Sequence, residues 1–166
     1  GKKLKAFPLP VGTTEKPGMF ADQSDTCFAG FVDGYLRLAN HRSAGPAGTD
    51  ALLDPRSGKL TPIGDPALFV SLGAGKFVVG NEEITYDEKK GSQSRVTLTT
   101  FDLVSGKHVT TTLPNQPRPE PETRSMLHTK LEGGKLGILY ANPPGFVSYD
   151  PAKHALGTPS NAPLCP

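Results

Sequence analysis

The chain has 166 residues, which suits one domain or two very small ones. Its 19 glycines and 17 prolines exclude a bundle of long helices, because proline blocks helix interiors and glycine weakens them. A net charge of +2 argues against a dedicated nucleic-acid-binding protein. No run approaches the roughly 18 consecutive apolar residues of a membrane-spanning helix, so we expect no membrane insertion.

Four short β-prone segments follow one another near the start of the chain, and the same series returns twice. The first series is 27–32, 34–40, 51–53 and 60–63. The second is 67–72, 75–81, 96–101 and 109–113. The third is 126–131, 134–142, 146–149 and 155–156. Each series predicts four strands in an antiparallel meander.

Two kinds of turn recur in the same order within each series. The first and second strands are joined by glycine turns at 32–34, 73–75 and 132–134. Tight hairpins need positive φ, which glycine adopts readily. The third and fourth strands are joined by turns that begin at aspartates, Asp54, Asp102 and Asp150, spaced 48 residues apart both times. We expect each aspartate to accept bonds from backbone amides two residues on.

Four strands per 40–50 residues are typical of a propeller blade. The sequence therefore predicts an all-β, propeller-like protein of three repeated four-stranded antiparallel sheets. We expect a single domain with units at about 19–63, 67–113 and 124–158, and terminal segments at 1–18 and 159–166. Three sheets allow a closed ring, an open stack, or half of a ring that a second chain completes. A β-sandwich with hairpins alike by chance is the alternative.

The two cysteines, Cys27 and Cys165, lie far apart in the sequence. A disulfide between them would tie the last unit to the first and would imply an oxidising compartment. The alternative is two unrelated buried thiols. No signal peptide is visible at the start of the chain, so the expected location, periplasmic or secreted, presumes one already removed.

The remaining connections vary strongly, and antiparallel order places them at the end of each sheet opposite the tight turns. Repeat proteins usually bind on such a face. Segment 82–95 holds many charges and a predicted mobile tip, Gly91-Ser92-Gln93-Ser94. It is either a solvated hairpin extension or a finger that enters a partner. Segment 114–121 has four prolines and predicts an extended connector or, alternatively, a recognition ligand.

The usual catalytic constellations are missing from the sequence. We find no nucleophile elbow, no zinc-protease helix motif and no phosphate loop. His108 and His154 follow equivalent turns, and the repeated aspartates read as caps of those turns. The sequence therefore predicts a protein that is not an enzyme and that carries no cofactor or metal.

In size, inferred architecture and compartment, the whole chain resembles the periplasmic immunity proteins that neutralise peptidoglycan-cleaving effectors of type VI secretion, some of which are compact β-propeller-like inhibitors. The resemblance implies that a loop plugs the active-site cleft of an amidase effector. Loop geometry makes the Ser92–Ser94 tip our candidate plug. The predicted partner-binding residues are His41, Arg42, Tyr86, Lys89, Lys90, Ser92, Gln93, Ser94 and Arg118. The alternative function is a non-catalytic ligand-binding or scaffold module of a cell-envelope complex.

Overall fold

The computed structural model describes residues 25–41, 50–89, 91–113, 116–117, 126–130, 132–140 and 145–160. These residues form three antiparallel sheets, and their one helical piece is a short 3₁₀ turn, Glu132–Gly134. Internal contacts divide the chain into two compact units, Gly1–Asp65 and Pro66–Pro166. The first unit holds one sheet and the second unit holds two. No helix among the described residues is long and apolar enough to cross a membrane.

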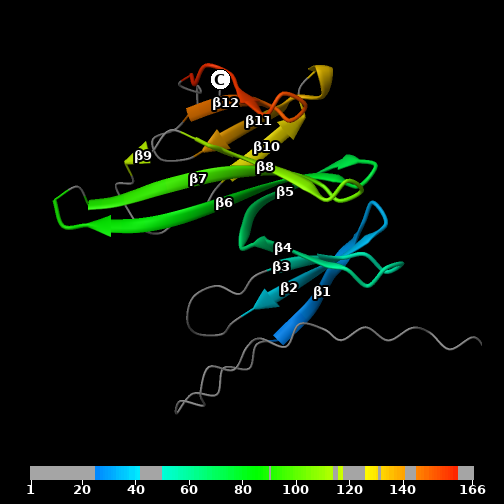
Figure 1. Ribbon diagram of the computed structural model, residues 1–166. Helices are drawn as coiled ribbons and strands as arrows, with labels where there is room; N and C mark the ends of the chain where they lie inside the picture. The colour runs from blue at the N-terminus through cyan, green and yellow to red at the C-terminus, as the bar shows by residue number, and fades with distance from the viewer. Residues whose placement is uncertain are drawn as a thin grey trace, which may run out of the picture. The chain divides into compact units, whose positions relative to one another are not determined.

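The strands of each sheet follow one another in chain order (Figure 1). The first sheet contains β1 (Asp25–Val32), β2 (Tyr35–His41), β3 (Asp50–Leu53) and β4 (Leu60–Gly64). The second contains β5 (Pro66–Gly73), β6 (Lys76–Asp87), β7 (Gly91–Asp102) and β8 (Lys107–Thr112), with β9 (Gln116–Pro117) also on β7. The third contains β10 (Met126–Lys130), β11 (Leu136–Tyr140), β12 (Gly145–Asp150) and β13 (Ala155–Leu156). The prediction of one meander built three times is confirmed.

The three sheets also share one register. The second and third strands align Leu36 with Leu53, Phe77 with Phe101, and Leu136 with Tyr149. Each last-named residue then aligns with the residue seven places on, which is Leu60, His108 or Leu156. An equal register across three sheets is what repetition of one unit produces. Closure of the sheets into a ring stays a prediction.

The first glycine turns have the geometry that the sequence requires. Asp33 and Gly34 have φ of 48° and 83°, and Ala74 and Gly75 have φ of 53° and 74°. Positive φ at both central residues defines the type I′ turn, whose twist matches that of the flanking strands. The third connection differs, because β10 and β11 are paired only as far as Lys130 and Leu136 and the 3₁₀ turn fills the gap.

The aspartate turns behave as predicted. Oδ1 of Asp54 accepts a bond of 2.9 Å from the backbone N–H of Arg56. Oδ1 of Asp102 accepts bonds from two backbone amides, those of residues 104 and 105, at 3.1 and 3.0 Å. Oδ1 of Asp150 does the same for residues 152 and 153, at 3.0 and 3.2 Å. These bonds satisfy backbone amides of the turn that do not pair between the strands. The aspartates that recur every 48 residues therefore have a structural role as turn caps.

Four residues after each aspartate, the chain passes through positive φ. Gly58 and Gly106 have φ of 77° and 73°, and the third copy places His154 there with φ of 52°. Left-handed backbone is unfavourable for residues that carry a Cβ. His154 is therefore a strained exception within the repeat, and its buried Nδ1 has no hydrogen-bond partner.

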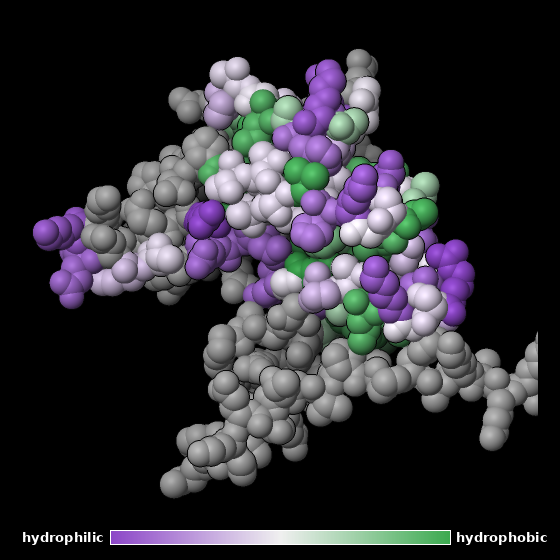
Figure 2. Space-filling view, in the orientation of Figure 1, coloured by the Kyte–Doolittle hydropathy of each residue, from purple (hydrophilic) through white to green (hydrophobic). Residues whose placement is uncertain are grey.

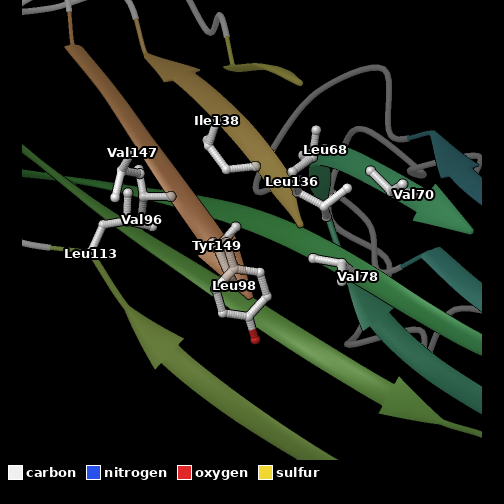
Figure 3. Packing of buried hydrophobic residues seen from close by; sticks show 10 residues of the cluster. All are labelled: Leu68, Val70, Val78, Val96, Leu98, Leu113, Leu136, Ile138, Val147 and Tyr149. Atoms are coloured by element: carbon white, nitrogen blue, oxygen red, sulfur yellow. The ribbon is translucent and has the colours of Figure 1, made fainter. Parts of the chain in front are cut away.

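The core of the second unit lies between its two sheets (Figure 3). The second sheet contributes Leu68, Val70, Val78, Val96, Leu98 and Leu113, and the third contributes Leu136, Ile138, Val147 and Tyr149. Two polar contacts cross the same interface. The Thr100 and Tyr149 hydroxyls lie 2.8 Å apart, and the Thr111 hydroxyl donates to the His154 carbonyl at 3.2 Å. The second and third sheets therefore form one packed body.

Candidate partner-binding site

The β6–β7 hairpin continues past the rest of its sheet. Pairing of β6 with β5 ends where Asn81 meets Pro66, whereas pairing of β6 with β7 continues to Asp87 and Gly91. The six further residues of β6 span about 20 Å at the usual rise of a strand. We call residues 82–96 the arm, and Figure 1 shows it reaching beyond the other labelled strands of the second unit.

Strand pairing within the arm corrects the predicted tip. Ser92, Gln93 and Ser94 belong to β7 and pair with Tyr86, Thr85 and Ile84. The prediction of a mobile tip at 91–94 is therefore wrong, because these residues lie in β7 and the chain reverses direction between Asp87 and Gly91. A Gly-Ser-Gln-Ser stretch is typical of a loop, but its backbone here completes a ladder with the β-prone residues of β6. The segment is a paired hairpin, a geometry that both predicted alternatives share.

The proline-rich segment supports the arm from one side. Gln116 and Pro117 form β9 and pair with Ser94 and Gln93 of β7. Proline has no N–H to donate, so it is tolerated where a strand has an open outer edge. A two-stranded hairpin alone is marginally stable in water, and a third strand stiffens it. The predicted connector is thus partly an edge strand, and the rest of 114–121 lies outside the described residues.

The two faces of the arm differ in character. Val96 aligns with Glu82 of β6, and Glu82 and Tyr86 are four residues apart on that strand. Because side chains alternate along a strand, Val96 and Tyr86 lie on the same face, which forms the core further along the sheet. Val96 is 7% exposed, whereas Tyr86, about 13 Å further out, is 76% exposed. The opposite face carries Glu83, Thr85 and Arg95, and Glu83 and Arg95 lie directly across the ladder with opposite charges.

The structure gathers part of the predicted binding set on this arm. Tyr86, Ser92, Gln93 and Ser94 lie on its strands, and Lys89 lies in the turn at its end. His41 is the last residue of β2, in the first unit. The other three predicted residues, Arg42, Lys90 and Arg118, fall outside the described residues. In Figure 2 the far end of the arm carries hydrophilic colours, in keeping with the exposed Glu88 and Lys89.

Three exposed residues of the arm, Glu83, Thr85 and Arg95, were missing from the predicted set. Their place together on one face follows from strand alternation once 82–87 and 91–96 are known to be paired. The signal in the sequence is the opposite charge of Glu83 and Arg95, which suits a cross-strand pair. That signal can be recognised only when the pairing register of the two strands is known.

The repeated acidic groups are held by their turns. The pKa of Asp54 is lowered from 3.8 to about 2, chiefly because the Arg56 backbone N–H donates to it, with help from the Ser57 hydroxyl. The pKa of Asp102 is also lowered, chiefly by the backbone N–H of Ser105. A carboxylate stabilised in its charged form is a poor general acid. Among the described residues, no three histidine, cysteine, aspartate or glutamate side chains form a group that would hold a metal.

The predicted disulfide has one partner in a described strand. Cys27 lies in β1, opposite Ala39 of β2, whereas Cys165 lies outside the described residues. The bridge between them stays a prediction.

The arm thus combines an exposed aromatic ring, charges of both signs and a backbone held by strand pairing. Such surfaces are typical of protein recognition, in which aromatic anchors stand among polar groups. Comparisons of the chain with protein-family models, with curated proteins and with solved structures find no match.

Proposed function

We propose that this chain is an exported protein-binding inhibitor that inserts its arm into a cleft of a partner protein. The partner in this proposal is a peptidoglycan-cleaving enzyme, which would make the chain an immunity protein of the type that the sequence resembles. One observation carries the proposal: a hairpin reaches about 20 Å beyond its sheet and presents Tyr86 with 76% of its surface exposed.

A stiff hairpin suits insertion for an energetic reason. Binding orders flexible side chains and loops at an unfavourable free energy, and a preorganised element avoids much of it. The arm is held by its own ladder and by β9, so little of its backbone remains to be ordered. The favourable free energy of the contacts is therefore not offset by the cost of ordering the arm.

Tyr86 is the proposed anchor of the interface. Tyrosine is enriched among the few residues that dominate binding energies, because its large ring loses little conformational entropy and its hydroxyl forms hydrogen bonds. Glu83, Thr85 and Arg95 on the opposite face suit the polar parts of a cleft.

Export and the Cys27–Cys165 bridge belong to the same proposal, and intact mass spectrometry of the non-reduced protein tests the bridge.

The test compares two exposed apolar residues of one sheet. Tyr86 lies on the arm, and Val104, 78% exposed, lies in the turn after the other end of β7. A partner is first captured from the periplasm of the source cells, and its affinity for each variant is measured by calorimetry. Tyr86→Ala should weaken binding about 30-fold, the factor for a hot spot of about 2 kcal/mol. Val104→Ala should leave affinity unchanged.

Inhibition is measured separately, as hydrolysis of peptidoglycan by the captured partner. The proposal expects hydrolysis to fall sharply at a wild-type concentration about three times its Kd, and to persist with Tyr86→Ala at that concentration, where a variant of about 30-fold weaker affinity is mostly unbound. Equal effects of the two substitutions on affinity would remove the arm from the interface. Tight, Tyr86-dependent binding that leaves hydrolysis intact would instead support a scaffold module.

A further inference from the structure

The first sheet has an outer strand with an unusual surface. β1 is at the end of the order β1-β2-β3-β4, and among the described residues it pairs with β2 alone. It carries two large exposed apolar side chains, Phe28 at 66% and Phe31 at 63%. Exposed apolar groups that gather on one element mark an interaction surface more often than scattered ones do.

A β-bulge gathers these two rings on one face. Residues three apart on a regular strand point to opposite faces, because the side chains alternate. The register of β1 shifts between Phe28 and Gly30, so that Phe28 aligns with Leu38 and Phe31 aligns with Leu36. Leu36 and Leu38 are two residues apart and share a face. The bulge therefore extends their apolar strip out to the edge of the sheet.

The other outer strands carry residues that discourage further pairing. Proline occurs in β4 (Pro62), at the start of β5 (Pro66) and in β9 (Pro117), and lysine begins β8 and ends β10. β13 has only two residues. Prolines, lysines and shortness are the usual ways to protect an open edge. Residues 26–32 of β1 hold no proline and no charge, and the bulge is the single protective feature of that strand.

We propose that β1 is the contact surface for a second copy of this chain, with two β1 strands paired antiparallel across a two-fold axis. An uncharged strand meets its own copy without repulsion, and two-fold dimers are the commonest assembly of identical chains. A register centred between Ala29 and Gly30 places Phe28 opposite Phe31 of the second copy.

The exposed rings set the scale of this interface. A phenylalanine exposed by about two thirds offers roughly 130 Å² for burial, so four rings give about 500 Å². Specific interfaces bury about 1,200–2,000 Å² in total, so the four rings alone fall short of a stable dimer and the proposed contact is weak. The dimer is thus expected to depend on protein concentration. This proposal stands independently of the arm and of its partner.

The test follows β1 by hydrogen exchange at low and high micromolar concentrations of the full chain, with sedimentation velocity on the same samples. Amides of 26–32 should become protected as concentration rises, in step with a dimer boundary. Phe31→Lys should abolish both changes, and Phe28→Lys serves as a second variant should the first fail to fold. Val104→Lys, at a residue that is also exposed but lies in the second unit, should leave both changes intact.

Three results would overturn the proposal. Protection of 26–32 that does not vary with concentration would mean that another part of the same chain covers β1. Rapid exchange at the highest concentration would mean that the edge remains open. A dimer that survives both Phe28→Lys and Phe31→Lys would form through another surface.

Discussion

Removal of the Tyr149 hydroxyl tests the hydrogen bond that links the second and third sheets. The ring is fully buried, and its hydroxyl lies 2.8 Å from Oγ1 of Thr100, which is 7% exposed as a residue. Tyr149→Phe keeps the ring and leaves the threonine hydroxyl buried without this bond. An unsatisfied buried group of this kind costs about 1–3 kcal/mol. Thr100→Val should lower the free energy of unfolding by a similar amount, because it leaves the tyrosine hydroxyl buried without a partner instead.

The double variant distinguishes a shared bond from two separate losses. When both partners of a buried hydrogen bond become apolar with little change in shape, the net effect on stability is small. Tyr149→Phe with Thr100→Val should therefore be closer to wild type than the sum of the single variants, with a coupling of about 1–3 kcal/mol. For a body of this size, a loss of about 2 kcal/mol lowers the Tm by roughly 8–16 °C.

The assay is thermal and urea unfolding followed by circular dichroism, with the urea m-value as a control for altered compactness. Additive single effects would refute the reasoning, because they would show that the two hydroxyls do not share a bond across the sheets.

Three further changes test the repeat and its core. His154→Gly should raise the free energy of unfolding by about 0.5–1 kcal/mol in urea titrations, because φ is 52° and Gly58 fills the same place; a loss of stability would contradict the assigned strain. Gly80→Ala should lower the unfolding free energy by about 1–3 kcal/mol, because the added Cβ would lie 2.8 Å from the Cβ of Leu68; a neutral result would mean that the sheet yields there. The charged form of Asp54 stabilises the fold fully above pH 3.8, and this contribution is lost as the pH falls toward about 2. Asp54→Asn should flatten the acid end of the pH–stability curve, and an unchanged slope would argue against the cap.

The sequence predicted the repeated sheets well where local chemistry decides the structure. Glycine is needed where φ is positive, as at Gly34 and Gly75, and an aspartate caps a turn through the amides that follow it, as at Asp54 and Asp102. Such signals lie within a few residues of the features that they produce. The strand boundaries around these turns were therefore predicted to within one or two residues.

The prediction failed where structure depends on a distant partner. Residues 91–94 have a loop-like composition, and only pairing with β6 makes them a strand. Gln116 and Pro117 join the sheet through β7 in the same way. The bulge that brings Phe28 and Phe31 to one face leaves no sign in their spacing, which a regular strand would place on opposite faces.

The candidate site was predicted in part for the same reason. Tyr86 and Lys89 were placed on a variable connection, and the structure locates them on the arm and at its end. The division of the arm into two faces needs the register, so Glu83 and Arg95 were missed.

The most direct measurement is the exposed surface of Tyr86 in a structure of the complex with the captured partner. Tyr86 is 76% exposed in the isolated chain. The account predicts that its ring becomes buried in the active-site cleft of a peptidoglycan-cleaving enzyme, with the arm on either side of it. A complex in which Tyr86 keeps its present exposure and the arm points to solvent would contradict the account.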